Sequence, residues 1–271
     1  MSVPNEQHRG RTSEPTIVDL ESTAASRRGG GGDLAIEHGG VGLRLIPERA
    51  ALVESTGTLL VADLHLDKPE AYRREGVPMP EGILEEMLDR LASAIVRTEA
   101  REVIVLGDLL HSRRGADRGT HERFAAWRER HPIPMRLIGG NHDRAASRHL
   151  EAWRIGDAGA EAEHQAEGGC LSLRHEPPGA RTLGESGDSG GPSPRDRACV
   201  AGHLHPMASL ARGTRRLLLP CFHRSISASA STLVLPAFTA FASGVRVQPA
   251  PGERVYAIAE GRVVEVTRAF G

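Results

Sequence analysis

Five short segments of this 271-residue chain carry side chains that could bind metal ions, and most of these segments follow an apolar run. The side chains are carboxylates, imidazoles and one amide, enough to hold two divalent ions that share one carboxylate. No thiolate is among them, and mixed oxygen and nitrogen ligands suit Mn²⁺, Fe and Zn²⁺ better than Ca²⁺ or a structural zinc. The segments are Asp63-Leu64-His65, Gly107-Asp108, Gly140-Asn141-His142-Asp143, His175 and Gly202-His203-Leu204-His205.

The spacing of these segments indicates a reaction as well as a ligand set. Two metal ions about 3.5–4 Å apart form a clamp for in-line displacement at phosphorus. The sequence therefore predicts metal-dependent hydrolysis of a phosphoester.

Strands must position these groups. The apolar runs that precede them are residues 59–62, 103–106, 137–138 and 199–201. Because ligands gather at the carboxyl ends of strands in open α/β sheets, we expect the polar groups to meet at one edge. Gly107, Gly140 and Gly202 come directly before polar groups, where glycine permits a sharp turn and a close backbone approach.

The remaining pattern predicts an α/β fold, because strands alternate with helices in the first half of the chain. Helices are expected at residues 81–97, where apolar residues recur with the helical period, and at 120–129. Strands are expected at 42–46, 50–53, 58–62, 102–106, 136–138, 198–201, 232–235, 254–259 and 262–267.

Composition suggests one domain with loose segments. Residues 1–32 are polar and rich in glycine and serine, so we expect a disordered N-terminal tail before a domain spanning 33–271. Residues 176–197 contain many glycines and prolines and show no hydrophobic period, which predicts a flexible loop inserted between ligand-bearing segments.

Charge and cysteine content narrow the class of protein. The formal net charge is −1, so no strong global field would draw the chain to nucleic acid or to a membrane. The three cysteines, Cys170, Cys199 and Cys221, form no disulfide or zinc pattern, and a reducing cytoplasm is the expected location. No apolar run approaches the roughly 20 residues that span a bilayer, so no membrane partner is expected.

In this order, the five segments resemble the pattern D-x-H, G-D, G-N-H-D/E, H and G-H-x-H of the calcineurin-like metallophosphoesterase superfamily, over about residues 42–266. The resemblance implies a two-sheet β-sandwich flanked by helices, with a dinuclear metal site at the carboxyl ends of strands. It implies Mn²⁺ as the preferred ion, with Fe or Zn²⁺ as alternatives.

The same resemblance divides the site residues by role. Asp63, His65 and His205 would hold the first ion, Asn141, His175 and His203 the second, and Asp108 would bridge both. His142 would face the substrate and either stabilise the transition state or protonate the leaving oxygen, and Asp143 would orient His142. A carboxylate behind an imidazole fixes its tautomer and raises its basicity, which gives that pair a physical rationale.

A closer resemblance concerns the segments 62–68, 107–112, 202–206, 219–222 and 235–238. They are similar to the bacterial ligase-associated DNA damage response endonucleases, which implies a DNA phosphodiesterase acting with a DNA ligase, an exonuclease and a helicase. Asp67 and Thr239 stand where that branch usually has glycine. Neither replaces a ligand, but both positions adjoin the expected site.

Several alternatives remain open at the level of sequence. His164 competes with His175 as a ligand, although His175 follows the apolar run 170–173 and is preferred. His111 either touches the substrate or is an ordinary loop histidine. The alternative functions are a small-molecule phosphatase or nucleotide phosphodiesterase, and a weakly active metal-bound scaffold in a repair complex. The intact His142-Asp143 pair argues against the scaffold, because docking needs no acid.

Overall fold

The computed structural model describes residues 31–112, 115–178, 198–212, 215–226 and 230–270. Nearly all of the expected tail at 1–32, and most of the expected loop at 176–197, lie outside these residues.

The first of two sheets has seven strands in the order β1-β2-β3-β4-β5-β6-β7. Strands β1 to β4 form an antiparallel meander, and β4 to β7 run parallel. The strands are β1 (Leu34–His38), β2 (Val41–Ile46), β3 (Ala50–Val53), β4 (Thr58–Val61), β5 (Glu102–Leu106), β6 (Met135–Ile138) and β7 (Gly156–Asp157).

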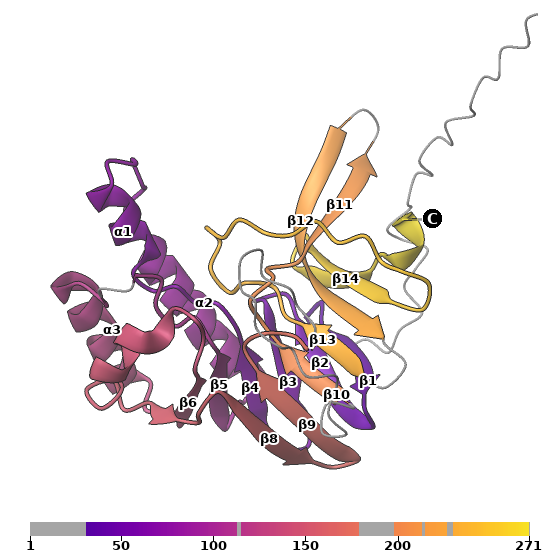
Figure 1. Cartoon of the computed structure of the whole chain (residues 1–271), viewed down its shortest axis with the longest axis horizontal. Helices are drawn as coiled ribbons and strands as arrows, with labels where there is room; N and C mark the ends of the chain where they lie inside the picture. Colours follow the sequence, from indigo (N-terminus) through magenta and orange to yellow (C-terminus); the bar gives the residue numbers. More distant parts are fainter. Residues whose placement is uncertain (1–30, 113–114, 179–197, 213–214, 227–229, 271) are drawn as a thin grey trace, which may run out of the picture.

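The second sheet has the order β15-β14-β12-β13-β10-β9-β8, and β11 pairs with β12 in a hairpin that projects from the sandwich (Figure 1). Its neighbours β9, β10 and β13 are parallel. The strands are β8 (Glu161–Ala166), β9 (Gly169–Arg174), β10 (Ala198–Ala201), β11 (Met207–Arg212), β12 (Arg215–Ile226), β13 (Ser231–Val234), β14 (Arg254–Ala259) and β15 (Arg262–Glu265).

Strand β5 shows why the central strands read as unbroken apolar runs. Ile104 and Leu106 face the core between the two sheets, whereas Val103 and Val105 face the core between the first sheet and the helices. Successive side chains of a strand point to opposite faces, so a strand covered on both sides is apolar at every position. The sheet-to-sheet core also holds Leu60, Leu173 and Val200.

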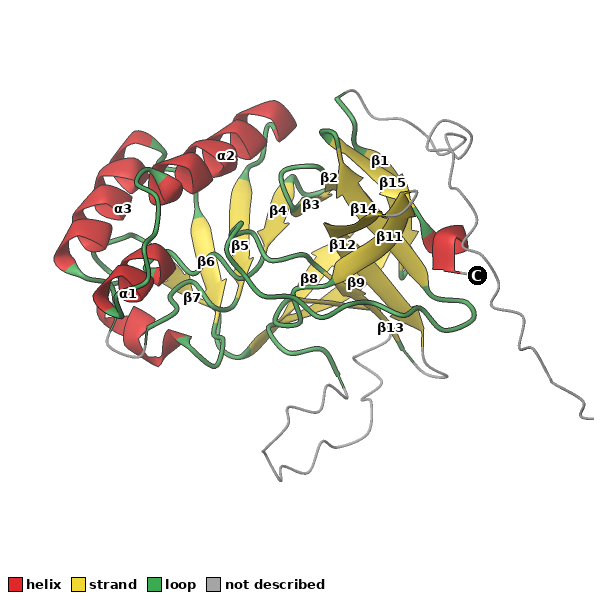
Figure 2. Cartoon of the chain, turned by 90° about the horizontal axis from the view of Figure 1, so that it is seen from above, coloured by secondary structure: helices red, strands yellow, loops and turns green. Residues whose placement is uncertain are grey.

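The α-helices cover the outer face of the first sheet (Figure 2). They are α1 (Lys68–Arg74), α2 (Ile83–Thr98) and α3 (Arg118–Arg130), and short 3₁₀ turns follow at η1 (Asp143–Arg148) and η3 (Thr267–Phe270). Leu88 and Leu91 of α2 pack with Phe124 and Trp127 of α3. The outer face of the second sheet packs against β11, the segment around Val247 and η3 instead of against α-helices.

The predicted fold class, two packed sheets with helices in an α/β arrangement, is confirmed. None of the helices in the described part of the chain is long and apolar enough to cross a membrane.

Candidate metal centre

Each predicted ligand lies just beyond the carboxyl end of a strand, as expected. Asp63 and His65 follow β4, Asp108 follows β5 and Asn141 follows β6 in the first sheet, whereas His175 follows β9, and His203 and His205 follow β10, in the second. These strands belong to the parallel parts of both sheets, so their carboxyl ends point to one edge of the sandwich. Residues up to 142 positions apart in sequence are thereby brought together.

One group of ligand atoms gathers around His175 Nε2. This nitrogen lies 3.0 Å from Asn141 Oδ1, 3.0 Å from His203 Nδ1 and 3.5 Å from Asp108 Oδ1. Ligands that share one ion at about 2.1 Å, at right angles, are about 3 Å apart. These spacings therefore match the set predicted for the second ion.

The other group lies on the opposite side of Asp108. Asp63, His65 and His205 each offer a ligand atom within 4.8 Å of the others, and Asp63 Oδ1 is 3.3 Å from His205 Nε2. Asp108 Oδ2 is 3.9 Å from His65 Nε2, whereas Oδ1 of the same carboxylate faces His175. Asp108 thus presents one oxygen to each group, which is the arrangement a bridging ligand requires.

Asp63 also lies near the second group, since Asp63, Asp108 and His175 each offer a ligand atom within 4.8 Å of the others. Its Oδ1 atom is 3.9 Å from His175 Nδ1. That nitrogen is already hydrogen-bonded to the Leu106 carbonyl at 3.0 Å, so only Nε2 of His175 is available to a metal. The pairing with His205 therefore places Asp63 in the first group.

Backbone carbonyls set the orientation of two imidazoles. His175 Nδ1 donates to the Leu106 carbonyl, and His205 Nδ1 donates to the Ser243 carbonyl at 2.9 Å. With the proton on Nδ1, the Nε2 lone pair of each ring points into the site. Metal-binding histidines usually donate their second ring N–H in this way, which fixes the tautomer and raises the basicity of the ligand.

The backbone of the ligand loops adopts an unfavourable conformation. Of the nine non-glycine residues with positive φ in the described segments, five are predicted ligands: Asp63 (55°), His65 (48°), Asp108 (51°), His203 (71°) and His205 (46°). A side-chain-bearing residue in this region costs about 1–2 kcal/mol. Such strain clusters at functional sites, where the surrounding structure holds it in place.

All three preceding glycines are needed for space, since a Cβ atom on Gly140 would lie 2.5 Å from Asp108 Oδ1. A Cβ atom on Gly107 would lie 2.2 Å from His175 Nδ1, and one on Gly202 would lie 2.8 Å from Asp63 Oδ2. Any larger residue there would displace a ligand.

The charges of the site favour a bound cation. Burial, helped by the nearby Asp63 carboxylate, raises the pKa of Asp108 to about 6, although His175 and His142 oppose the rise. Burial lowers the pKa of His65 to about 3, so its imidazole is neutral and free to bind a metal. Asp63 Oδ1, His65 Nδ1 and His205 Nε2 are buried without a hydrogen-bond partner. Unsatisfied buried polar atoms are costly, and a cation would satisfy those that face it. The donor set therefore fits divalent metal ions.

The structure corrects the expected contact between Asp143 and His142. The Asp143 carboxylate accepts hydrogen bonds from the backbone N–H groups of Gly140 at 2.9 Å and Leu110 at 3.2 Å, while His142 Nδ1 has no partner. Asp143 therefore joins two ligand-bearing loops and does not contact the imidazole. Local sequence does not distinguish these roles, because adjacent residues in a turn can point in different directions.

The alternative ligand His164 lies away from the centre. His164 lies on strand β8, and its Nε2 atom is 3.1 Å from Thr56 Oγ1. His111, in contrast, lies at the site. Its ring stacks on that of His142 with centroids 5.4 Å apart and meets the ring of His65 edge-on at 5.2 Å.

Asp67 and Thr239, which stand where the ligase-associated endonucleases usually have glycine, both contact the ligand loops. The fully buried Asp67 carboxylate accepts hydrogen bonds from the backbone N–H groups of His111 at 2.6 Å and Ser112 at 3.0 Å. The Thr239 backbone N–H donates to the Asp63 carbonyl at 3.3 Å. Asp67 thus holds the loop that carries His111, a link that the sequence marked only as a departure from a pattern.

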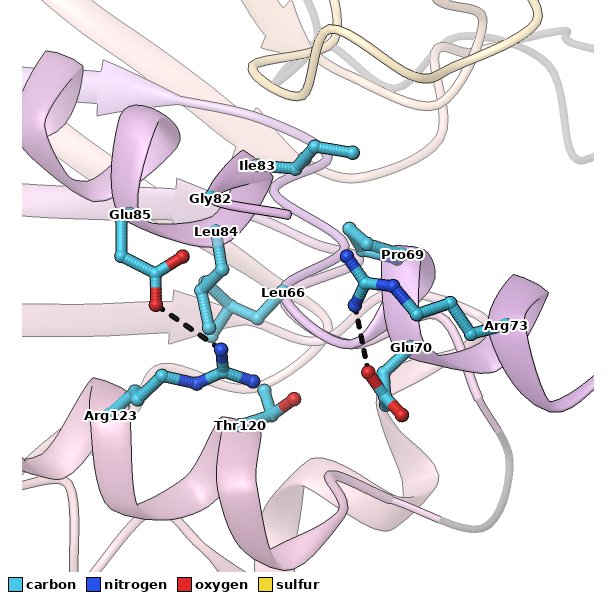
Figure 3. Close-up of a pocket in the computed structure, with 10 residues that line it drawn as sticks. All are labelled: Leu66, Pro69, Glu70, Arg73, Gly82, Ile83, Leu84, Glu85, Thr120 and Arg123. Atoms are coloured by element: carbon cyan, nitrogen blue, oxygen red, sulfur yellow. Dashed lines mark hydrogen bonds and ion pairs between the residues drawn. The ribbon is translucent and has the colours of Figure 1, made fainter. Parts of the chain in front are cut away.

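A separate hollow lies between the three α-helices (Figure 3). Arg73 points to Glu70 at 2.8 Å, and Arg123 points to Glu85 at 3.2 Å. The charges that Figure 3 draws are therefore paired with one another, and no predicted ligand lines this hollow. This hollow is therefore separate from the predicted metal centre.

Comparison with known proteins identifies the fold. No family model matches the chain, and no curated protein matches it in sequence. Among solved structures, the nuclease MPE of Pseudomonas putida is 29% identical, with a TM-score of 0.64, and the match covers 86% of this chain and 100% of the nuclease. The chain has a calcineurin-like metallophosphoesterase fold. More distant matches among solved structures are the phosphoesterase YfcE of E. coli (14% identity, TM-score 0.40, 78% and 98% covered) and a Vps29 variant of Entamoeba histolytica (14%, 0.36, 77% and 96%).

Proposed function

We propose that the protein is a divalent-metal-dependent phosphoesterase that hydrolyses phosphodiester bonds in DNA. The observation that carries this proposal is the position of Asp108, whose two carboxylate oxygens face two separate groups of ligand atoms. A pair of adjacent cation sites suits displacement at phosphorus. The likeness to a Pseudomonas putida nuclease supports a phosphodiester, and a nucleic acid, as the substrate.

The ligands divide as the two groups suggest. In this proposal Asp63, His65 and His205 hold the first ion. Asn141, His175 and His203 hold the second, and Asp108 binds both. When bound, the ions supply an activated water and neutralise charge on the phosphoryl oxygens. Oxygen and imidazole ligands favour Mn²⁺ in our proposal, and Fe or Zn²⁺ are the alternatives to be compared.

His142 is the proposed acid. Its backbone N–H donates to Asp108 Oδ1 at 3.1 Å, which anchors the residue at the bridge between the two groups. Its ring centroid is 6.0 Å from that of His65, and its Nδ1 atom has no partner. We propose that this imidazole contacts the substrate phosphate and donates a proton to the leaving oxygen. Asp143 would support it indirectly, by holding the loop on which it stands.

A role in DNA repair belongs to the same proposal. The resemblance of the segments around Asp63, Asp108 and His203 to ligase-associated endonucleases supports action in the cytoplasm with a DNA ligase, an exonuclease and a helicase. Pull-down of the full chain with each purified partner would test this association separately from activity.

The proposed activity has a direct test. The purified protein, loaded in turn with Mn²⁺, Fe²⁺ and Zn²⁺, is assayed on bis-p-nitrophenyl phosphate, on supercoiled plasmid and on mononucleotides. We expect the diester to be hydrolysed and the plasmid to be nicked, with Asp108→Ala inactive as the control. Hydrolysis of mononucleotides without nicking would favour a small-molecule phosphatase. Inactivity on all substrates with all three ions would overturn the proposal.

A further inference from the structure

Lys68 is the only lysine in the chain, which contains 33 arginines. It is only 4% exposed, and it begins α1 directly after the first ligand loop. Its backbone N–H donates to the His65 carbonyl at 3.0 Å, so its position is tied to a predicted ligand. A buried cation at this place in the fold requires an explanation.

Within the described part of the chain, no carboxylate lies within ion-pair distance of the Lys68 ammonium. Its recorded contact is with an aromatic ring, since Nζ lies 5.8 Å from the centroid of Tyr72. The nearest candidate partners are otherwise engaged. Asp63 binds the His203 backbone and faces His205, and Asp67 binds the backbone of the next loop. Internal ion pairing therefore does not account for the burial of Lys68.

The charge of the Lys68 ammonium nevertheless interacts with the charged and titratable groups of the site. Burial lowers the pKa of Lys68, and the carboxylates of Asp63 and Asp108 oppose that shift. The charge of Lys68 in turn helps to lower the pKa values of His65 and His111. The geometry agrees with this influence. The Tyr72 ring that Nζ faces lies 6.1 Å from the ring of His111, which in turn lies 5.2 Å from the ring of the predicted ligand His65.

Metal loading would leave this cation without a counter-charge. Two divalent ions carry about +4 and the carboxylates of Asp63 and Asp108 about −2, so the loaded centre keeps about +2 before Lys68 adds its own charge. A buried charge next to a centre of the same sign is unfavourable unless an anion offsets both. The site is therefore built to receive a negatively charged group.

A lysine at this position suits a contact with a single oxygen atom better than an arginine would. Arginine presents a broad planar fork with five donors, whereas lysine presents a compact point charge on a flexible stem. In a chain that uses arginine elsewhere, the single lysine occupies a buried position directly after the first ligand loop. An ammonium carries three donors against the five of a guanidinium, so a contact with one oxygen atom leaves fewer buried donors without a partner.

We propose that Lys68 is a phosphate-binding residue of the active site, whose ammonium donates to a non-bridging oxygen of the substrate phosphate. This inference rests on the proposed function, because it takes the phosphate to lie at the metal centre. It adds to that function a protein cation that touches the substrate.

The test measures binding of inorganic phosphate to the Mn²⁺-loaded full chain by calorimetry, which needs no activity. Lys68→Met should weaken phosphate binding by about 10- to 100-fold, the range expected for one charge-assisted hydrogen bond, while the Mn²⁺ content stays unchanged. Arg74→Met is the matched control, since Arg74 is an exposed cation on the same helix. Equal phosphate affinity in Lys68→Met and the wild type would overturn the inference.

A second measurement uses the wild type alone and stands if Lys68→Met fails to fold. Lys68 is the sole side-chain amine, so acetylation of side-chain amines by acetic anhydride, followed by mass spectrometry, reports on this residue only. Mn²⁺ with phosphate should slow acetylation of Lys68 relative to Mn²⁺ alone, and equal rates would contradict the inference. Phosphate binding through Lys68 in a protein without hydrolytic activity would overturn the proposed function and keep this inference. An active enzyme whose phosphate affinity is unchanged in Lys68→Met would overturn this inference and keep the proposed function.

Discussion

The backbone N–H of His203 donates a hydrogen bond of 2.9 Å to Asp63 Oδ2, and this bond joins the two sheets at the candidate metal centre. Asp63 follows β4 of the first sheet, and His203 follows β10 of the second. Oδ1 of the same carboxylate faces His205 instead. Asp63 therefore serves both the fold and the site, with one oxygen for each.

This division predicts different results for two substitutions of Asp63. Asp63→Asn keeps an oxygen for the His203 N–H but removes the negative charge, so metal content should fall sharply while the fold persists. Asp63→Ala also leaves the partly buried N–H of His203 unsatisfied, so its free energy of unfolding should be lower than that of Asp63→Asn by about 1–3 kcal/mol. Metal analysis, and urea unfolding in the presence of chelator, measure the two effects. Equal unfolding free energies for the two variants would contradict the structural role of Oδ2.

His175 and His164 provide a matched pair for testing the ligand assignment. His175→Gln removes the nitrogen around which Asn141, His203 and Asp108 gather, so metal content should fall from about two ions per chain to about one. His164→Gln retains a hydrogen-bonding group for Thr56 and should keep both ions. Loss of metal in the His164 variant, with retention in the His175 variant, would reverse the assignment.

The ligand segments were predictable from sequence because their chemistry and their strand ends agree. A short run rich in β-branched residues such as 103–106 favours a strand buried on both faces, and a polar residue directly after such a strand lies at the edge of the sheet. The expected strands and both expected helices are present, with boundaries shifted by a few residues. Strand β8 escaped notice because it carries alternating polar residues, and α1 because it is short and mostly polar.

The side-chain contacts of the site were less predictable. The expected pairing of Asp143 with His142 was wrong, because the Asp143 carboxylate accepts hydrogen bonds from the backbone N–H groups of Gly140 and Leu110 instead. The burial of Lys68 was also not foreseen, since a lysine at the start of a short helix usually reaches solvent. Both outcomes depend on how distant loops pack, which local patterns do not encode.

His142→Ala should separate binding from catalysis. The variant loses the imidazole proposed to protonate the leaving oxygen, so turnover of bis-p-nitrophenyl phosphate should fall by about 10²- to 10⁴-fold. The backbone N–H that binds Asp108 remains, and metal content should therefore match the wild type. Steady-state kinetics beside metal analysis check this, with His164→Gln as the control. A wild-type rate in His142→Ala would remove this residue from the mechanism.

Asp143→Asn should loosen the loops without removing a ligand. The amide oxygen can accept one of the two backbone N–H groups, but its NH₂ group would then oppose the other donor. We expect a loss of about 1–3 kcal/mol in the free energy of unfolding, with metal content retained. Asp157→Asn is the control, because Asp157 is exposed and accepts a single backbone bond, from Gly159 at 2.8 Å. An equal effect in both variants would show that burial of the Asp143 acceptor is unimportant.

A second bond between the sheets, remote from the metal centre, predicts a pH dependence of stability. The fully buried His38 of β1 donates through Nε2 to the Cys199 carbonyl of β10 at 2.9 Å. Burial lowers the pKa of His38 to about 4, against an unfolded value of about 6.5, although the bond to Cys199 opposes the shift. Between these values the unfolded chain binds a proton that the folded chain excludes. The free energy of unfolding should therefore fall as pH drops from 7 to 4, by about 3 kcal/mol from this residue.

His38→Gln isolates that contribution, because its amide N–H can still donate to the Cys199 carbonyl but does not titrate. Urea unfolding is measured for both proteins between pH 4 and pH 7, with chelator present so that metal loss does not add to the slope. The other titrating groups are common to both proteins and cancel in the difference. The wild type should lose about 3 kcal/mol more than His38→Gln over this range. Parallel curves would mean that His38 accepts a proton in the folded state, which its complete burial should prevent.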